Sequence, residues 1–285
     1  MSCSIVMLAG PGDADTVRLM FNHAVRTSQY SFQYRALTID TLPSRRYSDR
    51  HPATAQLLAV ANAMRDAGEI DAILSTSDPA DDIELKHFGH HLDRKRDFRG
   101  IPLLGWAIGV EQAPTDYVCH FDSDILMHAD AGYSWITQAI QTLAHDPAIM
   151  FVAPKGGPPN GAISAPVVAK TFSSRRFVVD RRKLKAILPL PPAHSSWKRR
   201  LLMKFGGASS YWPWEYHVGQ AMVASPYSNM WLGDERAWFI HSPDHGDRWR
   251  RSLEQLVHDC ERGHFPAAQA GHGELQLEAW LDRVA

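Results

Sequence analysis

The chain has 285 residues, with 30 lysine or arginine against 31 aspartate or glutamate, so its formal net charge is −1. Its 45% hydrophobic and 21% charged residues are typical of a globular protein and argue against disorder as the main state. A net charge near zero argues against a partner held by overall charge, so we expect no nucleic acid partner. No apolar run approaches the roughly 18 residues that span a bilayer.

The three cysteines are Cys3, Cys119 and Cys260, which are widely spaced and form no C-x-x-C pair. This spacing predicts neither a disulfide framework nor a cysteine metal site, and it favours a reducing compartment. The first ten residues lack a basic region and carry only a short apolar run, so we interpret them as a strand and not as a signal peptide. We therefore expect a cytoplasmic protein.

Strands and helices alternate through the first half of the chain, with apolar positions at helical spacing after the cap predicted at Asp13. We expect strands at 5–10, 35–39, 70–75, 117–121 and 148–153, and helices at 17–25, 53–67, 100–112 and 130–144. This alternation is typical of a mostly parallel sheet covered by helices.

The second half begins with a loop predicted at 155–161, and prolines at 189–192 mark a further break. Residues 238–241 are predicted to form a hydrophobic strand. Two amphipathic helices are expected at the C-terminal end, over 248–262 and 274–284.

An acidic turn follows the predicted strand at 117–121, where the sequence reads Asp122-Ser123-Asp124. Open α/β sheets bind ligands at the carboxyl ends of their strands. Two carboxylates one residue apart repel each other unless a cation lies between them, so the pattern indicates Mg²⁺ or Mn²⁺ held together with phosphate oxygens. The same residues are also good turn and N-cap formers, which is the plain structural alternative.

The segment from Gly100 to Ile125, in which a helix, a short link and a strand lead into this D-x-D, resembles the core signature of GT-A glycosyltransferases of the family-two type. The resemblance covers about 30 residues well and the rest of the chain loosely. It implies a GT-A (Rossmann-like) fold over 1–285, with a mixed, mostly parallel sheet and a C-terminal helical segment. The implied parts are a nucleotide-sugar-binding half at 1–125, an acceptor-binding half at 126–246 and C-terminal helices at 247–285.

The resemblance also implies roles for individual residues. Asp124 would bind the metal directly, and Asp122 would contact the ribose or sugar of the donor and support the metal. An earlier strand end contacts the nucleotide in this family, and it matches Asp78, with Thr76 as a helper; a polar loop is the alternative.

The first loop departs from the family pattern. A short Pro-x-x-Asn turn is usual there, and this chain has Gly-Pro-Gly-Asp. The small residues Ala9 and Gly10 would still let the nucleotide approach the backbone closely. The departure leaves the identity of the base open.

An inverting transferase needs a carboxylate that deprotonates the acceptor hydroxyl. Glu215 lies in an aromatic cluster and resembles the late acidic motif of the family, although the second acidic position is occupied by Tyr216. Trp212 and Trp214 beside it would stack on sugar rings, or else pack in the core.

His241 and His245 follow the hydrophobic strand predicted at 238–241. A late histidine completes the metal site in many GT-A enzymes, so the resemblance implies one of them as a further ligand, with His241 the first choice. His87, His90 and His91 form another cluster, for which a solvated loop is the favoured interpretation.

These features predict a metal-dependent glycosyltransferase that moves a sugar from a nucleotide-diphosphate donor to an acceptor hydroxyl, with Mn²⁺ or Mg²⁺ as cofactor and inversion at the anomeric carbon. The acceptor would be a glycan, a lipid-linked molecule or a small molecule. Two alternatives are kept: a nucleotidyltransferase, and a catalytically silent module that binds sugar nucleotides or glycans.

Charge is unevenly distributed along the chain. Residues 155–204 hold twelve lysines and arginines and one acidic residue, Asp180. Such a segment would attract an anionic donor, a phosphorylated acceptor or a membrane surface, so a peripheral membrane contact is a further expectation; a solvated basic face is the alternative.

Overall fold

The computed structural model describes residues 1–42, 51–77, 80–161, 165–191, 209, 211–243 and 245–281. The larger of its two sheets has the order β3-β2-β1-β4-β9-β6-β10-β8. Its strands are β1 (Cys3–Ala9), β2 (Tyr34–Ile39), β3 (Ala72–Ser75), β4 (Tyr117–Asp122), β6 (Ile149–Ala153), β8 (Val167–Ala169), β9 (Arg176–Asp180) and β10 (Ser228–Trp231). β3, β2, β1 and β4 run parallel to one another, and β10 runs parallel to β6. β9 lies antiparallel between β4 and β6, and β8 pairs antiparallel with β10.

A second sheet stands beside the first, with the order β5-β11-β7. It consists of β5 (Ile125–Ala129), β7 (Lys155–Gly156) and β11 (Ala237–His241). β5 begins immediately after Asp124 and pairs antiparallel with β11, so that Ile125 lies opposite His241. The chain thus passes from one sheet to the other at the D-x-D turn.

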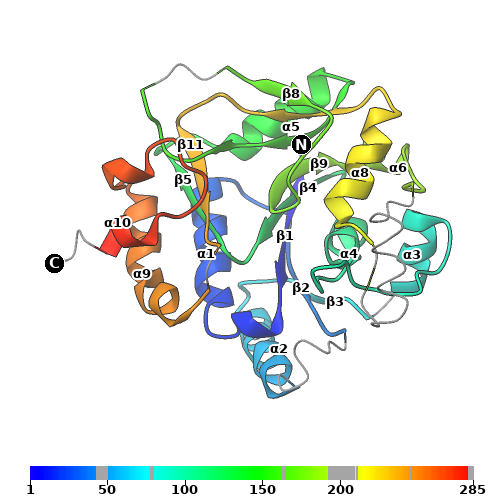
Figure 1. The fold of residues 1–285 in the computed structure, drawn as a ribbon, viewed down its shortest axis with the longest axis horizontal. Helices are drawn as coiled ribbons and strands as arrows, with labels where there is room; N and C mark the ends of the chain where they lie inside the picture. Colours follow the sequence, from blue (N-terminus) through cyan, green and yellow to red (C-terminus); the bar gives the residue numbers. More distant parts are fainter. Residues whose placement is uncertain are drawn as a thin grey trace.

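Helices cover both faces of the larger sheet (Figure 1). On one side lie α1 (Val17–Ser28), α2 (His51–Asp66), α9 (Asp247–Glu261) and α10 (Leu277–Leu281), and on the other lie α3 (Ala80–Phe88), α4 (Gly105–Gln112) and α8 (Trp214–Val223). α5 (Trp135–His145) packs on β6 and β9, and the short α6 (Arg181–Lys185) follows β9. Two separate hydrophobic cores result, one on each face of the sheet.

The close packing of α4 on β1 depends on Gly109. A Cβ atom at this position would lie 2.6 Å from Val6 Cγ1, which is closer than any real contact. Glycine therefore lets the helix that leads into β4 lie directly on the sheet.

The predicted fold class, a mixed and mostly parallel sheet flanked by helices with further helices at the C-terminal end, is confirmed. The three cysteines are buried and free, as their spacing predicted. No helix in the described part of the chain is both long and apolar enough to cross a membrane.

Several predicted boundaries are wrong. The helix expected from 100 begins at Gly105, because Arg96 and Pro102 form an antiparallel bridge across the preceding loop. The helix expected from 130 begins at Trp135, where Ser134 Oγ accepts a hydrogen bond from the Thr137 N–H as the N-cap. The loop expected at 155–161 starts with the two residues of β7.

A buried histidine fixes α9, which contributes to the candidate site, against α1. His23 is fully buried; its Nδ1 donates to Glu261 Oε1 at 2.9 Å, and its Nε2 accepts from the Met127 N–H at 2.8 Å. Burial opposes ionisation of Glu261, but hydrogen bonds from His23 and Arg26 outweigh it and lower the pKa of Glu261 to about 2.

This arrangement predicts a pH-dependent stabilisation. Because the folded-state pKa of Glu261 is depressed, its contribution is present above its ordinary value of 4.5 and is lost as the pH falls towards 2. We expect Glu261→Ala to lower the free energy of unfolding by about 1 kcal/mol at pH 7, after allowance for partial exposure, and by less at pH 3. Urea unfolding at both pH values measures this; Glu254→Ala, an exposed glutamate on the same helix, is the control. A loss that is equal at both pH values would contradict the electrostatic explanation.

Candidate active site

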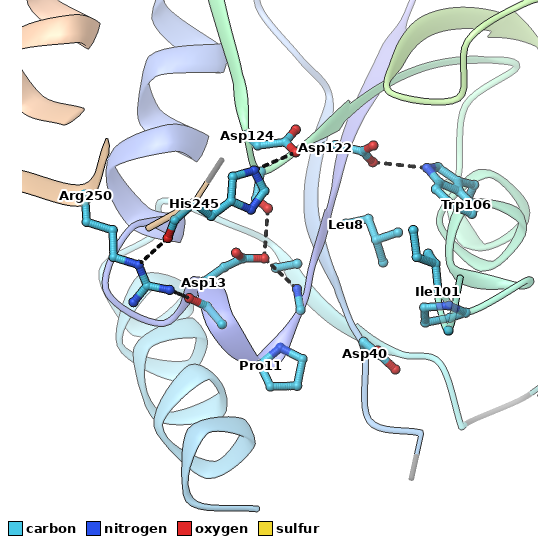
Figure 2. Close-up of a pocket in the computed structure, with 16 residues that line it drawn as sticks. Leu8, Pro11, Asp13, Asp40, Ile101, Trp106, Asp122, Asp124, His245 and Arg250 are labelled. Carbon is cyan, nitrogen blue, oxygen red and sulfur yellow. Dashed lines mark hydrogen bonds and ion pairs between the residues drawn. The ribbon is translucent and has the colours of Figure 1, made fainter. Parts of the chain in front are cut away.

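The loops after β1, β2 and β4 meet at one edge of the sheet because these strands are parallel neighbours, with Leu8 opposite Asp122 and Ala9 opposite Ile39. A cavity of about 410 Å³ opens at this edge. Five residues predicted for the site line it (Ala9, Gly10, Asp122, Asp124 and His245), and so do four functional candidates that the sequence interpretation missed (Asp13, Asp40, Trp106 and Arg250; Figure 2).

Asp124 is held by both late histidines. Its Oδ2 lies 3.3 Å from His241 Nε2 and 3.2 Å from His245 Nε2, whereas its Oδ1 is buried without a hydrogen-bond partner among the described residues. Burial disfavours the charged carboxylate, but the hydrogen bonds and charges of the two histidines outweigh it and hold the pKa of Asp124 below its ordinary value. The hydrogen bond to Asp124 raises the pKa of His245 in turn.

Asp122 points from the end of β4 towards α4, on the other side of the turn (Figure 2). Its Oδ1 accepts from Trp106 Nε1 at 3.1 Å and from His120 Nε2 at 3.0 Å. Burial lowers the pKa of His120 to about 3, so the ring is neutral at physiological pH. Because His120 Nδ1 is buried and has no partner in the described structure, the proton belongs on Nε2.

The environments of the two aspartates separate their acidities. Burial and the nearby charge of Asp124 raise the pKa of Asp122 well above its ordinary value, while that of Asp124 is lowered. A divalent cation between the two carboxylates would remove this repulsion and ionise both.

The donor set fits such a cation. Asp124 Oδ1 is an unsatisfied buried oxygen, and buried polar atoms of this kind call for an ion or water. His241 and His245 supply imidazole nitrogens beside it. Carboxylate oxygens combined with imidazole suit Mn²⁺ better than Ca²⁺.

Asp13 and Arg250 join the loops around the cavity. Asp13, predicted as the cap of the first helix, lies instead in the 3₁₀ turn Pro11–Asp13, and its Oδ2 accepts from the Gly10 N–H at 2.7 Å and from Ser123 Oγ at 2.8 Å. Arg250, on α9, donates to the main-chain oxygens of Gly12 at 3.0 Å and His245 at 3.1 Å. These contacts fix the first loop to the D-x-D turn and to the His245 loop (Figure 2).

Asp40 lies directly after β2 and lines the cavity. Arg96 binds both of its oxygens, at 2.9 and 3.1 Å. Thr76 does not line the cavity: it is fully buried, and its hydroxyl accepts from the Thr41 N–H at 2.9 Å and lies 3.4 Å from Asp40 Oδ1. Thr76 thus supports Asp40, while Asp78 lies outside the described residues.

Glu215 is in the first turn of α8, as the late acidic motif implied. Its Oε2 accepts from both the N–H and the hydroxyl of Ser174, each at 2.8 Å. After burial and the charge of Asp124, the charge of Glu215 is a smaller contributor to the raised pKa of Asp122, and Glu215 does not line the 410 Å³ cavity. Oε1 has no hydrogen bond from a described residue.

The two tryptophans beside Glu215 have different surroundings. Trp214 is fully buried among Trp106, Phe172 and Phe177, so the predicted sugar stacking by Trp214 is wrong: a side chain sealed in the core offers no face to a ligand. Trp212 is partly exposed and stacks on Tyr216, and its contact with a sugar ring stays a prediction.

The second histidine cluster has its own partners. His87 is buried against Glu111, and His91 approaches Glu84. Asp81, Glu84 and His91 lie close enough to hold a metal, but Lys95 Nζ is 2.8 Å from Asp81 and 3.6 Å from Glu84 and supplies the positive charge.

Comparisons with known proteins give structural similarity alone. No protein-family model and no curated sequence matches the chain. Similar solved structures include the mannosyltransferase PcManGT from Pyrobaculum calidifontis in complex with GDP-Man and Mn²⁺ (12% identity, TM-score 0.48, 98% of this chain and 69% of that one). Others are S. aureus TarS (11%, 0.46, 84% and 36%) and the galactosyltransferase LgtC in complex with donor and acceptor sugar analogs (13%, 0.42, 90% and 96%).

The chain spans about a third of TarS and about two thirds of the mannosyltransferase. At these identities and scores, what this chain does has to be argued from its own site.

The hydrogen bond from Trp106 to Asp122 gives a testable consequence. Trp106→Phe keeps an aromatic ring beside Trp214 but removes the N–H that orients Asp122. We expect affinity for a nucleoside diphosphate with Mn²⁺ to fall about 10-fold, which is typical for loss of a supporting hydrogen bond at a metal site. Calorimetric titration measures it, and unchanged affinity would show that Asp122 needs no such support.

Proposed function

We propose that this protein is a metal-dependent glycosyltransferase of the GT-A type that uses a nucleotide-sugar donor. The observation that carries the proposal is the group formed by Asp124, His241 and His245 at the end of β4, with an unsatisfied carboxylate oxygen beside a cavity of about 410 Å³. A cavity of this size accommodates a small organic ligand.

The metal site would consist of Asp124, Asp122, His241 and His245. A bound Mn²⁺ or Mg²⁺ would neutralise the diphosphate of the donor and thereby improve it as a leaving group. Asp122 Oδ1 is occupied by Trp106 and His120, so its Oδ2 is the oxygen available to the ribose, the sugar or the metal.

The nucleoside would lie over the first loop, where Ala9 and Gly10 offer backbone without obstructing side chains. Asp40 faces the same cavity, and Arg96 keeps it oriented. A carboxylate fixed in this way accepts hydrogen bonds from N–H groups of a base or from ribose hydroxyls.

Glu215 would act as the base. Ser174 donates two hydrogen bonds to Oε2, which leaves Oε1 to take the proton of the acceptor hydroxyl as it attacks the sugar. This assignment makes the transfer inverting. Trp212 would contribute a face to the acceptor sugar.

The proposal also assigns a binding role to each part of the chain. Residues 1–125 would bind the donor, 126–246 the acceptor, and 247–285 would close the site through Arg250. The acceptor remains a glycan, a lipid-linked molecule or a small molecule.

The described part of the basic segment 155–204 gives little support to a membrane contact. Lys155, Arg175 and Arg182 are ion-paired, and Lys170, Arg181 and Lys183 donate to main-chain oxygens. Lys198, Arg199, Arg200 and Lys204 lie outside the described residues.

Incubation with Mn²⁺ and a panel of nucleotide sugars tests the proposal. We expect release of a nucleoside diphosphate from one member of the panel, slowly with water and faster with an acceptor. Release of pyrophosphate from a nucleoside triphosphate would indicate a nucleotidyltransferase instead.

A further inference from the structure

Arg176 differs from the neighbouring Arg175, Arg181 and Arg182 because its guanidinium has no hydrogen-bond or ion-pair partner among the described residues. It opens β9 opposite Phe121, one residue before Asp122, and is only 4% exposed. No described residue forms a hydrogen bond or an ion pair with its side chain, and its Nε is buried and unsatisfied. Nearby Arg175, Arg181 and Arg182 all have carboxylate or carbonyl partners.

The guanidinium packs against the face of an aromatic ring, that of Phe239. Its central carbon lies 3.2 Å from the centre of the Phe239 ring. That ring is itself closely packed, because a Cβ atom on Gly156 would lie 3.1 Å from it. One face of the guanidinium is therefore covered, and its edge, which carries the N–H donors, is the part left to a ligand.

Arg176 lies next to the candidate active site, beside the end of β4, although it does not line the cavity of about 410 Å³. Asp122 and Glu215 are the carboxylates whose charges favour its ionised form, while burial and Arg175 disfavour that form and lower its pKa to about 9. Neither carboxylate is close enough to form an ion pair with it. A buried arginine without a direct counter-ion is destabilising, so such a residue is expected where an anionic ligand completes the site.

We propose that Arg176 is an anion-binding residue that takes a phosphate or carboxylate group of a ligand through the edge of its guanidinium, in the neighbourhood of Asp122 and Glu215. The inference rests on the proposed function and refines it. The anionic group belongs either to the diphosphate of the donor or to an acceptor that carries a phosphate or carboxylate. Both present the planar pair of oxygens that suits a guanidinium.

The test compares Arg176→Met with Arg175→Met. Methionine is similar in length and uncharged, and Arg175 is the adjacent arginine, half-exposed and paired with Glu274. Calorimetric titration with inorganic pyrophosphate and with inorganic phosphate measures anion affinity, and thermal unfolding without ligand measures stability.

We expect Arg176→Met to weaken binding of the anion at least 10-fold while leaving the melting temperature unchanged or higher, because an uncompensated buried charge has been removed. Arg175→Met should keep anion affinity within about 2-fold. A lower melting temperature with unchanged anion affinity would overturn the proposal, since it would make Arg176 a structural counter-charge for the two carboxylates. Should Arg176→Met fail to fold, Arg176→Lys is the variant to measure. It keeps the positive charge but loses the planar set of guanidinium N–H donors, so undiminished affinity for the anion would again overturn the proposal.

Two further binding measurements identify which ligand carries the anionic group. Weaker binding of UDP or GDP with Mn²⁺ to Arg176→Met assigns the residue to the donor diphosphate. Binding of inorganic phosphate to wild-type protein already saturated with nucleoside diphosphate, and its loss in the variant, assigns it to the acceptor. If nucleoside diphosphates bind neither protein, the proposed function fails, and the titrations with phosphate and pyrophosphate alone still decide the role of Arg176.

Discussion

Replacement of Glu215 by glutamine is expected to lower the rate of glycosyl transfer about 1000-fold and to leave the binding of nucleoside diphosphate with Mn²⁺ unchanged. A well-placed general base contributes about 10²–10⁴ in rate. The glutamine oxygen can still accept both hydrogen bonds from Ser174, so the position of the side chain is retained while its ability to take a proton is lost. Steady-state rates together with calorimetric affinity separate the two effects.

The control is Glu235→Gln, a glutamate on the same chain that pairs with Lys155 away from the cavity and should retain full activity. Ser174→Ala provides an intermediate case, because it removes one of the two hydrogen bonds that fix the carboxylate. Full activity of Glu215→Gln would place the base elsewhere or make the transfer retaining.

Asp124→Asn is expected to weaken the Mn²⁺-dependent binding of nucleoside diphosphate by about 100-fold or more, because supporting residues alone contribute 10–100-fold at metal sites and a direct ligand contributes at least as much. The substitution removes the charge that faces His241 and His245 and replaces one carboxylate oxygen by an NH₂ group. Removal of the metal with EDTA should have the same effect on the wild-type protein. Titration of nucleoside diphosphate at fixed Mn²⁺ concentration measures both.

Asp130→Asn is the matched control. Asp130 follows β5, at the end opposite Asp124, and pairs with His128 Nε2 at 3.0 Å, so the same type of aspartate–histidine pair is altered outside the donor cavity. Equal loss of Mn²⁺-dependent binding in both variants would indicate a general effect on folding. Retained binding in Asp124→Asn would remove it from the metal site.

The sequence predicted the parallel part of the sheet well, because helical and extended periodicities alternate clearly between Cys3 and Asp122. It missed β5, β7, β8, β9 and β10, and the pairing of β5 with β11. β5 and β9 are short and pair antiparallel, and no crossover helix marks them. The partner of β5 lies more than 100 positions away in the sequence.

The candidate site was predicted best where a motif coincides with a strand end. The D-x-D turn and the two late histidines come together as expected, and both histidines, not one, face Asp124. Asp40 could have been found by the same logic, since it directly follows the strand predicted at 35–39. Asp13 and Trp106 could not, because their contacts with Ser123 and Asp122 are tertiary contacts that no periodicity encodes.

Trp214, in contrast, was assigned to the site although it belongs to the core. A tryptophan next to a catalytic candidate is equally compatible with a ligand-binding surface and with a core, and local sequence does not distinguish them. The packing of Trp214 against Trp106 and Phe177 from distant segments decides for the core.

The most direct test of a metal-dependent nucleotide-sugar site is thermal unfolding of the wild-type protein with uridine, guanosine, thymidine, adenosine and cytidine diphosphates, each with and without Mn²⁺. Binding to the folded state stabilises it by about 2.7 kcal/mol at a ligand concentration 100 times the dissociation constant, which shifts the melting temperature by several degrees. We predict such a shift for at least one diphosphate, only when Mn²⁺ is present. No shift with any of the five, or an equal shift without metal, would contradict the assignment of Asp122, Asp124, His241 and His245 to this role.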